Sequence, residues 1–260
     1  MIEQSIKILS NDIVLPDTFL LRFHSPELAA SARPGQFIMV KVNDRTDPAL
    51  RRPFSICGTE DGSIVKILYK VIGKGTEILS NKKPGENLPA LGPLGKGFAL
   101  SDQAKKIFYV AGGIGIAPLL YLYQKTKLSN ITFLTGFRTS NEIIDPQKVG
   151  TQADNLIATD DGSMGYNGRV TDLLVEHLEQ SEQKDICIYT CGPLPMLKAV
   201  RGICIRYNIP CQVSMETFMA CGLGACQGCV IRSNIAQSPY LHVCQEGPVF
   251  DINEIDWDNI

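Results

Sequence analysis

The feature that most constrains this chain is a set of four cysteines near its C-terminal end. Three lie in the stretch CGLGACQGC and the fourth follows alone, and their positions are Cys221, Cys226, Cys229 and Cys244. The spacing C-x4-C-x2-C with one later cysteine is typical of plant-type [2Fe–2S] sites, in which thiolates hold two irons. Glycines between the first three cysteines let the backbone curl around a cluster and bring N–H groups close to its sulfides. The sequence therefore predicts a small [2Fe–2S] module over residues 214–260.

Two other uses of clustered cysteines stay open. A structural zinc ion also takes four cysteines, but it usually uses two C-x2–4-C pairs, and the second pair is missing here. Disulfide pairing needs an oxidising compartment, whereas the first ten residues carry Glu3 and no apolar core of signal-peptide length. We therefore expect a cytoplasmic protein with reduced thiols. The other five cysteines show no metal spacing and are expected to be buried apolar residues.

Length and charge limit the partners. The chain has 260 residues, enough for two compact domains and a small module. With 25 basic and 27 acidic residues, the formal net charge is −2. This balance argues against non-specific nucleic-acid binding and against a polybasic membrane anchor. No apolar run is long enough to span a bilayer. We expect neither nucleic acid nor membrane among the partners.

Residues 1–100 are expected to form a small antiparallel β-barrel. Short runs rich in β-branched and aromatic residues alternate with Pro, Gly, Asn and Asp, which is typical of such barrels. The runs cover residues 6–9, 18–23, 36–42, 54–57 and 63–71. The one helix expected in this part covers residues 76–80, and the glycine- and proline-rich stretch 91–98 is interpreted as a boundary between domains.

Two motifs in this part suggest a flat, phosphorylated ligand. The first combines an arginine that matches a phosphate, a proline that stiffens the approach, an aromatic ring face and a hydroxyl. Its residues are Arg52, Pro53, Phe54 and Ser55. The second is GKGT, with Gly75 and Thr76 at the start of the expected helix, where backbone N–H groups can hold an anion. A surface arginine and a simple hairpin turn remain alternatives.

Residues 101–213 change to alternating strands and helices, which predicts a parallel α/β domain with ligands at the carboxyl ends of its strands. The expected strands are 106–111, 131–136, 155–159, 185–190 and 212–215, and the expected helices are 119–127, 169–178 and 195–207. Two glycine turns follow strands. Gly113 and Gly115 form a turn without the third glycine of a full dinucleotide motif, and Cys191, Gly192 and Pro193 form the other. A turn without phosphate and a packed core thiol remain alternatives.

Taken in order, these motifs resemble the ferredoxin–NADP reductase superfamily. Within it, the chain is similar to the electron-transfer subunits of the NAD-dependent class 1B dihydroorotate dehydrogenases. The resemblance rests on RPFS at 52–55, GT at 75–76, GGIGIAP at 112–118, CGP at 191–193 and the four cysteines, and it covers essentially the whole chain. It implies an FAD-binding β-barrel at 1–100, an NAD-binding α/β domain at 101–213 and the cluster module at 214–260.

The resemblance also implies particular contacts. Expected FAD contacts are Arg52, Pro53, Phe54, Ser55, Leu68, Tyr69, Lys70, Gly75 and Thr76. Expected contacts to NADH are Gly113, Gly115, Cys191, Gly192 and Pro193, with the loop 159–163 nearby. After the expected strand 131–136, Arg138 could hold a 2′-phosphate and Glu142 a free ribose hydroxyl. The resemblance favours NADH.

The function that the resemblance implies is electron relay. A nicotinamide gives two electrons as a hydride, whereas a [2Fe–2S] cluster takes one, so a flavin is expected between them. The partner would be an FMN-containing catalytic subunit that converts dihydroorotate to orotate in pyrimidine synthesis, in a heterotetramer of two copies of each subunit. Two alternatives stay open: a related subunit that serves a ferredoxin, hydrogenase or sulfur reductase, and a zinc-stabilised nucleotide-binding regulator. We expect no catalytic acid or base, because the sequence shows no paired carboxylates and no Ser/His/Asp set.

Overall fold

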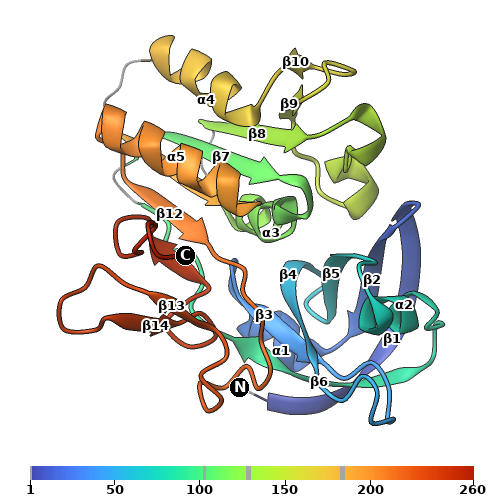
Figure 1. Cartoon of the computed structure of the whole chain (residues 1–260). Coiled ribbons are helices and arrows are strands. Elements are labelled where there is room, and N and C mark those ends of the chain that lie inside the picture. Colours follow the sequence, from blue (N-terminus) through green and yellow to red (C-terminus); the bar gives the residue numbers. More distant parts are fainter. Residues whose placement is uncertain (1, 102–103, 127–129, 182–184) are drawn as a thin grey trace.

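The computed structural model describes residues 2–101, 104–126, 130–181 and 185–260. Figure 1 shows a β-barrel built from the first part of the chain, a sheet with helices built from the middle part, and a C-terminal segment beside both. The predicted fold class, an antiparallel barrel followed by a parallel α/β sheet and a small C-terminal region, is confirmed.

Six antiparallel strands close the barrel in the order β1-β2-β5-β4-β3-β6, because β6 pairs with β1 as well as with β3. Side chains that alternate along the strands fill its interior, among them Phe23, Ile56 and Ile67. The strands are β1 (Ile2–Leu15), β2 (Thr18–His24), β3 (Phe37–Val40), β4 (Arg52–Glu60), β5 (Ile64–Lys70) and β6 (Asn87–Leu94). The expected helix near residue 76 is α2 (Lys74–Ser80).

Two expectations for the barrel were wrong. A helix at α1 (Pro26–Ser31) was not expected, yet the Ser25 side chain caps it by accepting from the Leu28 N–H, and Pro26 suits its first turn. Residues 91–94 belong to β6 rather than to a boundary between domains. Pro93 fits inside that strand because the pairing of β6 with β3 shifts register there, and proline is tolerated at such irregularities.

The second sheet has seven strands in the order β10-β9-β8-β7-β11-β12-β15. Its parallel strands are β7 (Lys106–Gly112), β8 (Ile131–Phe137), β9 (Asn155–Thr159), β10 (Tyr166–Asn167), β11 (Ile186–Cys191) and β12 (Cys211–Ser214). The edge strand β15 (Val249–Asp251) comes from the C-terminal segment and pairs with β12 in the antiparallel sense. This pairing attaches the C-terminal segment to the sheet.

Helices cover both faces of this sheet (Figure 1). On β7, Tyr109 and Ala111 point to the face that carries α3 (Ile116–Lys125). Phe108 and Val110 point to the opposite face, against α4 (Val170–Glu179) and α5 (Leu194–Tyr207). The expected helix 119–127 begins earlier, at Ile116, directly after the 3₁₀ turn η1 (Gly113–Gly115). Pro118 allows this because proline is tolerated in the first turn of a helix. The expected last residue, 127, lies outside the described residues.

The C-terminal segment contains little regular structure besides the hairpin of β13 (Val230–Arg232) and β14 (Tyr240–His242). Two further 3₁₀ turns lie between β8 and β9: η2 (Ser140–Glu142) and η3 (Pro146–Val149).

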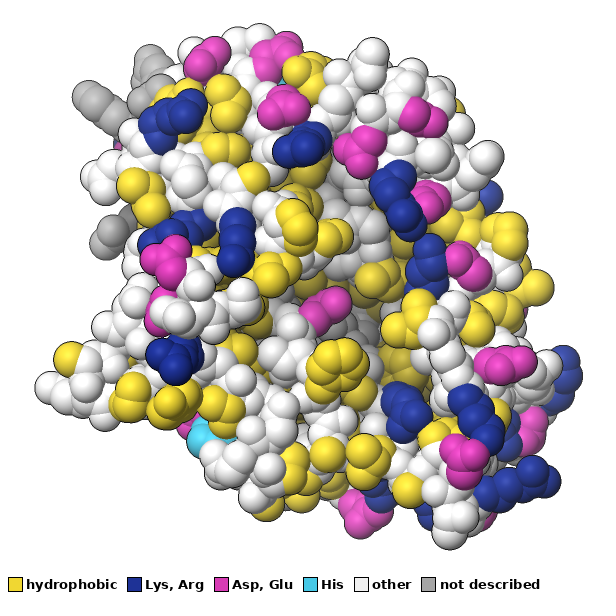
Figure 2. All heavy atoms as spheres, viewed as in Figure 1, with side chains coloured by type: hydrophobic (Ala, Val, Ile, Leu, Met, Phe, Trp, Pro, Cys, Tyr) yellow, Lys and Arg dark blue, Asp and Glu magenta, His cyan; other side chains and the backbone are white. Residues whose placement is uncertain are grey.

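Over the part of the chain that the structure covers, no helix has the length and apolar character that crossing a bilayer requires. On the face that Figure 2 shows, basic and acidic side chains are interleaved rather than gathered by sign.

Candidate functional site

The arginine of the first barrel motif lies directly against the glycine of the second. Arg52 opens β4, and its Nη1 donates to the Leu50 carbonyl over 2.6 Å. A Cβ atom added at Gly75, on α2, would lie 2.7 Å from Nε of Arg52. Residues 52 and 75 therefore form one surface, and only a glycine at position 75 leaves room for the guanidinium. A cationic group beside a helix start is the chemistry that a pyrophosphate requires.

Thr76 shapes the turn that precedes α2. Its Oγ1 accepts from the backbone N–H groups of Ile72, over 3.0 Å, and Gly73, over 3.2 Å. The same hydroxyl donates to the Gly73 carbonyl over 2.9 Å. Thr76 is buried, so it holds this loop in shape rather than facing open solvent. Its predicted contact to FAD stays a prediction.

The three predicted residues of β5 point to two different sides. Leu68 and Lys70 share the outer face, where Leu68 packs in the core between barrel and sheet and Lys70 pairs with Asp17 over 3.0 Å. Tyr69 points into the barrel, where its ring lies 5.6 Å from that of Phe54 and its hydroxyl donates to Asn11 over 3.0 Å. Burial raises the pKa of Tyr69 to about 12. The Tyr69 ring therefore contributes to the barrel core.

The two glycine turns of the α/β part meet, although they lie far apart in the sequence. They follow β7 and β11, which pair in parallel with Cys191 opposite Ala111. A Cβ atom at Gly115 would lie 2.5 Å from the Cys191 carbonyl oxygen, and one at Gly192 would lie 2.9 Å from the Gly112 nitrogen. Two backbones in contact at the carboxyl ends of adjacent strands form the crevice in which such sheets bind nucleotides.

Side chains behind these turns were not predicted. Met196 of α5 backs Gly112, because a Cβ atom there would lie 2.7 Å from the methionine sulfur. Burial raises the pKa of the Cys191 thiol, and the nearby Glu216 carboxylate raises it further, so Cys191 stays protonated. Glu216 carries no motif of its own and lies near Cys191 only because β12 ends beside β11. Sequence spacing alone could not have found it.

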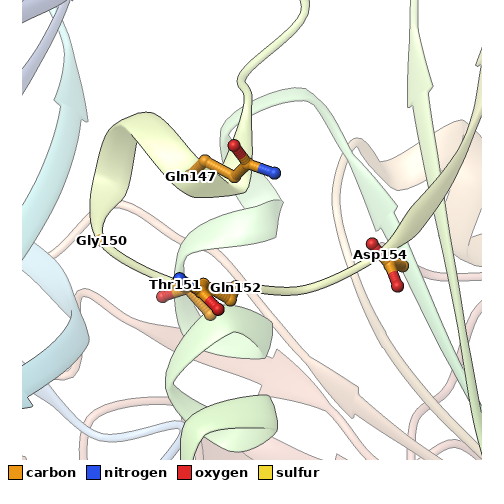
Figure 3. A pocket seen from close by; sticks show the side chains of 5 residues that line it. All are labelled: Gln147, Gly150, Thr151, Gln152 and Asp154. Carbon is orange, nitrogen blue, oxygen red and sulfur yellow. The ribbon is translucent and has the colours of Figure 1, made fainter.

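A cavity of about 190 Å³ lies between barrel and sheet, and two of the predicted residues border it: Lys70 from the flavin set and Gly113 from the nicotinamide set. Its other walls come from the β1–β2 turn and from the segment after β8. A Cβ atom at Gly113 would meet nothing within 4 Å, so this glycine faces open space. A larger cavity of about 500 Å³ lies along the loop that follows η3 (Figure 3) and is bordered by none of the predicted residues.

The segment after β8 carries a balanced ion pair at the position that the ribose of a dinucleotide is expected to reach. Arg138 Nη2 lies 3.1 Å from Glu142 Oε1. Glu142 also borders the cavity between barrel and sheet. The neighbouring loop is tied in place, because the Ser140 N–H donates to Ser163 Oγ over 2.7 Å. With Arg138 neutralised by Glu142, a 2′-phosphate would have no free cation from this pair.

The four cysteines of the C-terminal loop lie in two pairs. The Cys226 thiol is close enough to Cys221 to affect its pKa, and the Cys229 thiol is close enough to Cys244 to affect its pKa. Burial acts to raise the pKa of Cys221, but backbone N–H groups on its sulfur outweigh it and lower the pKa to about 6. Burial and the adjacent Cys229 raise the pKa of Cys244 to about 12. All nine cysteines of the chain are free thiols.

Backbone N–H groups surround the sulfurs, as the glycines of the loop led us to expect. Gly224 donates to the Cys244 sulfur over 3.1 Å, Leu223 to Cys221 over 3.3 Å, and Gly228 to Cys226 over 3.4 Å. Two pairs of thiols with N–H donors between them suit a cluster of two irons, each of which takes two thiolates.

The cluster loop lies against the barrel strand that neighbours the arginine motif. A Cβ atom at Gly222 would lie 2.7 Å from Cγ of Met39. Met39 belongs to β3 and pairs directly with Pro53 of β4. Within the C-terminal segment itself, Gln245 Nε2 donates to the Leu223 carbonyl over 3.0 Å and holds the cysteine loop in shape. The cysteine loop and the residues 52–55 are therefore separated by a single strand.

Two parts of the chain match known protein families. Residues 216–256 match the iron–sulfur cluster binding domain of dihydroorotate dehydrogenase B. Residues 109–202 match the oxidoreductase NAD-binding domain. The match at 216–256 includes all four cysteines, and the match at 109–202 includes both glycine turns.

Curated relatives extend the likeness to nearly the full length. A Desulforamulus reducens protein named dihydroorotate dehydrogenase B (NAD(+)), electron transfer subunit, is 39% identical over 259 residues, which is 97% of both chains. A protein of the same name from Caldanaerobacter subterraneus is 37% identical over 96% of both chains. Among solved structures, a chain described with the NADH-dependent reduced ferredoxin–NADP oxidoreductase has a TM-score of 0.85 at 29% identity, and the match covers 97% of this chain and 90% of the other.

Proposed function

The chain belongs to the family of electron transfer subunits of dihydroorotate dehydrogenase B (NAD(+)), and from this premise we propose how it works. It relays electrons between NAD⁺/NADH and the FMN of a catalytic partner subunit, and it holds FAD and a [2Fe–2S] cluster for this purpose. A flavin exchanges a hydride with a nicotinamide and single electrons with an iron–sulfur cluster, which is the chemistry that the bound groups supply.

One observation carries this proposal: the cysteine loop contacts the barrel beside the arginine motif. Gly222 lies against Met39, and Met39 pairs with Pro53. A flavin held by Arg52 and Gly75 would therefore lie within one strand of the cluster ligands. Short separation is what electron transfer between two carriers requires. A nucleotide-binding regulator with a structural zinc would have no need of it.

The chain's own groups position the nucleotides. Gly113 borders the cavity and faces open space, and a glycine turn at the start of a helix suits a pyrophosphate. Gly192 and Pro193 border the same crevice from β11. Arg52 offers a bidentate cation to the phosphates of the flavin nucleotide. The buried Cys191 thiol stays neutral, so it excludes water from this corner without adding a charge.

The partner and the pathway also belong to the proposal. We place opposite the cluster loop an FMN-containing catalytic subunit that oxidises dihydroorotate in pyrimidine synthesis, with two copies of each chain in the assembly. The name of the relatives, electron transfer subunit, supports a catalytic partner. Free thiols at every cysteine support a reducing compartment, and we place the protein in the cytoplasm.

Anaerobic purification tests the proposal. The protein as purified is expected to show flavin and iron–sulfur absorption and to lose the flavin bands when NADH is added. Co-expression with candidate partners then identifies the acceptor, which is expected to contain FMN and to bind orotate. A colourless protein loaded with zinc would refute the relay.

A partner without FMN would instead favour a subunit that serves a ferredoxin. The likeness to the chain of the NADH-dependent reduced ferredoxin–NADP oxidoreductase supports this second candidate. Orotate binding by the co-purified partner separates the two, because orotate is the product of a dihydroorotate dehydrogenase and not a ligand of a ferredoxin.

A further inference from the structure

A buried lysine joins the barrel to the nucleotide-binding part, and no motif accounts for it. Lys66 lies in the middle of β5 and its side chain is 0% exposed. Lysine is rarely buried in this way unless its ammonium group is fully partnered. An ammonium has three N–H donors, so its partners can be counted.

Three acceptors surround the Lys66 ammonium, and they come from two parts of the chain. Glu60 Oε1, on the neighbouring strand β4, lies 2.9 Å away. The carbonyls of Val149 and Gly150, at the end of η3, lie 3.0 and 3.4 Å away. Each donor of the ammonium thus has an acceptor, and two of the three acceptors are backbone groups of the sheet part.

The backbone conformation at Gly150 brings the loop after η3 close to this ammonium. Gly150 has a φ of +74°, a left-handed conformation that favours glycine, and it ends η3. A Cβ atom on Gly150 would lie 3.1 Å from Glu60 Oε1 and 3.2 Å from Lys66 Nζ. Figure 3 shows Gly150 at the bend of the loop, beside Thr151 and Gln152. The backbone at residue 150 therefore lies directly over the ion pair.

A second contact next to Lys66 joins the same two parts. Gln124, near the end of α3, donates to the Thr59 carbonyl over 2.6 Å and accepts from the Thr59 N–H over 3.2 Å. Gly58 leaves space for both side chains, because a Cβ atom there would lie 2.9 Å from Lys66 Cε and from Gln124 Oε1. α3 is the helix that begins at the Gly113–Gly115 turn. We call the contacts of Lys66 and Gln124 the clamp, and it holds the far end of the helix that starts at the nucleotide crevice.

The outer face of β5 links the clamp to the cavity between barrel and sheet. Lys66, Leu68 and Lys70 share this face because strand side chains alternate. Leu68 packs in the core between the two parts, and Lys70 borders the cavity. The loop that Lys66 holds at residues 149–150 continues from Glu142 and Ile144, which also border the cavity.

From this arrangement we propose that Lys66 is a positioning residue for hydride transfer, which fixes the nicotinamide side of the cavity against the flavin side. The proposal rests on the proposed function. Lys66 touches neither nucleotide. It sets the relative placement of the glycine turn at residues 113–115 and the barrel strand that ends at Lys70, so that the two reacting rings meet at short range. Such placement matters because a shift of about 1 Å between reactants can cost about 100-fold in rate.

The test uses the full chain with its flavin and the variant Lys66→Met, which keeps side-chain length and removes the ammonium. Reduction of the flavin by saturating NADH is followed by stopped-flow absorbance, with and without deuterium at the transferred position. The rate is expected to fall between about 10- and 100-fold, with a larger isotope effect, while the NADH dissociation constant changes less than about twofold. Glu60→Gln keeps the two carbonyl contacts and is expected to lose less.

Lys82→Met is the matched control. Its ammonium also lies 2.9 Å from a glutamate, Glu86, but both residues lie in the barrel segment, between α2 and β6. This variant is expected to reduce its flavin at the wild-type rate. Wild-type rates in both Lys66→Met and Glu60→Gln would overturn the proposal, as would a loss of rate that merely follows a loss of bound flavin. Glu60→Gln keeps the test decisive if Lys66→Met does not fold.

The assay separates this inference from the function on which it rests. It needs no partner subunit, because it measures only the step from NADH to the bound flavin. If the wild-type chain fails to reduce its flavin with NADH, the proposed function itself is wrong. If the wild-type chain is active and the variants match it, only the role of Lys66 is wrong.

Discussion

Replacing Gly75 with alanine should separate flavin binding from folding. The added Cβ atom would lie 2.7 Å from Nε of Arg52, 3.1 Å from Cζ and 3.2 Å from Nη2. Ordinary van der Waals contact requires about 3.4 Å or more, so the guanidinium must retreat by roughly 0.7 Å. A phosphate contact of about 2.9 Å would then stretch to about 3.6 Å, which is no longer a hydrogen bond. The variant Gly75→Ala is therefore expected to lose the contact that Arg52 makes to the flavin nucleotide.

The size of the loss follows from the kind of bond. A hydrogen bond to a charged group contributes about 1.5–3 kcal/mol, which corresponds to roughly 10- to 150-fold in the FAD dissociation constant. Folding should change little, because the crowded atoms belong to the end of a flexible side chain. Alanine in place of glycine within a helix stabilises by up to about 1 kcal/mol, which offsets the lost bond from Arg52 to the Leu50 carbonyl.

The assay is titration of the apoprotein with FAD, followed by flavin fluorescence, together with thermal unfolding of the apoprotein. Gly202→Ala is the control, because Gly202 lies in α5 and a Cβ atom there would meet nothing within 4 Å. A double-mutant cycle with Arg52→Ala completes the test. If Gly75→Ala acts through Arg52, it should weaken FAD binding in the wild type and change it little in the Arg52→Ala background. Wild-type affinity in Gly75→Ala would refute the assignment of Arg52 to a flavin phosphate.

Three further predictions test the other parts of the site. Cys229→Ser should remove the iron–sulfur absorption and stop transfer to the partner while NADH still reduces FAD; electron transfer to the partner at the wild-type rate would contradict the relay. Glu142→Gln frees Arg138 from its ion pair, so the ratio of kcat/KM for NADPH to that for NADH should rise about tenfold, and an unchanged ratio would place the ribose elsewhere. Gly115→Ala puts a Cβ atom 2.5 Å from the Cys191 carbonyl oxygen, so KM for NADH should rise and the melting temperature should fall by several degrees. A variant with wild-type values of both would show that the two glycine turns need not touch.

The spacing and order of motifs were enough to predict the fold class, an antiparallel barrel followed by a parallel α/β sheet and a small C-terminal region. The cysteine spacing predicts residues 221, 226 and 229 as cluster ligands because they lie in one short loop, and Cys244 as the fourth because the pattern places a lone cysteine after that loop. The two glycine turns could be expected to meet, since parallel strands end at the same edge of a sheet. The change from short strands to alternating strands and helices near residue 100 likewise follows from local periodicity.

Contacts between distant segments could not be predicted in this way. β15 is a strand of three residues, and nothing in Val249–Asp251 indicates that it pairs with β12. Lys66 lies in the run IVKILYK, where alternation predicts a lysine that faces solvent; its burial depends on a loop more than 80 residues away. Glu216 lacks a motif and reaches Cys191 only through strand order. The helix α1 was missed for a different reason, because six residues give too short a periodic signal.

Gly75, Gly115 and Gly222 each leave room for a group from another segment. The nature of that group decides whether a side chain at the glycine would disturb folding or binding. At Gly75 the neighbour is the end of the flexible Arg52 side chain, which can retreat, so binding suffers more than folding. At Gly115 the neighbour is the backbone of Cys191 and Gly192, which cannot retreat without moving β11. At Gly222 the neighbour is Met39, which is fully buried in the barrel wall, and the φ of +72° adds strain for any other residue. Substitution at residue 222 should therefore move the cysteine loop away from the flavin motif. Loss of electron transfer with both cofactors retained would be the mark of that displacement.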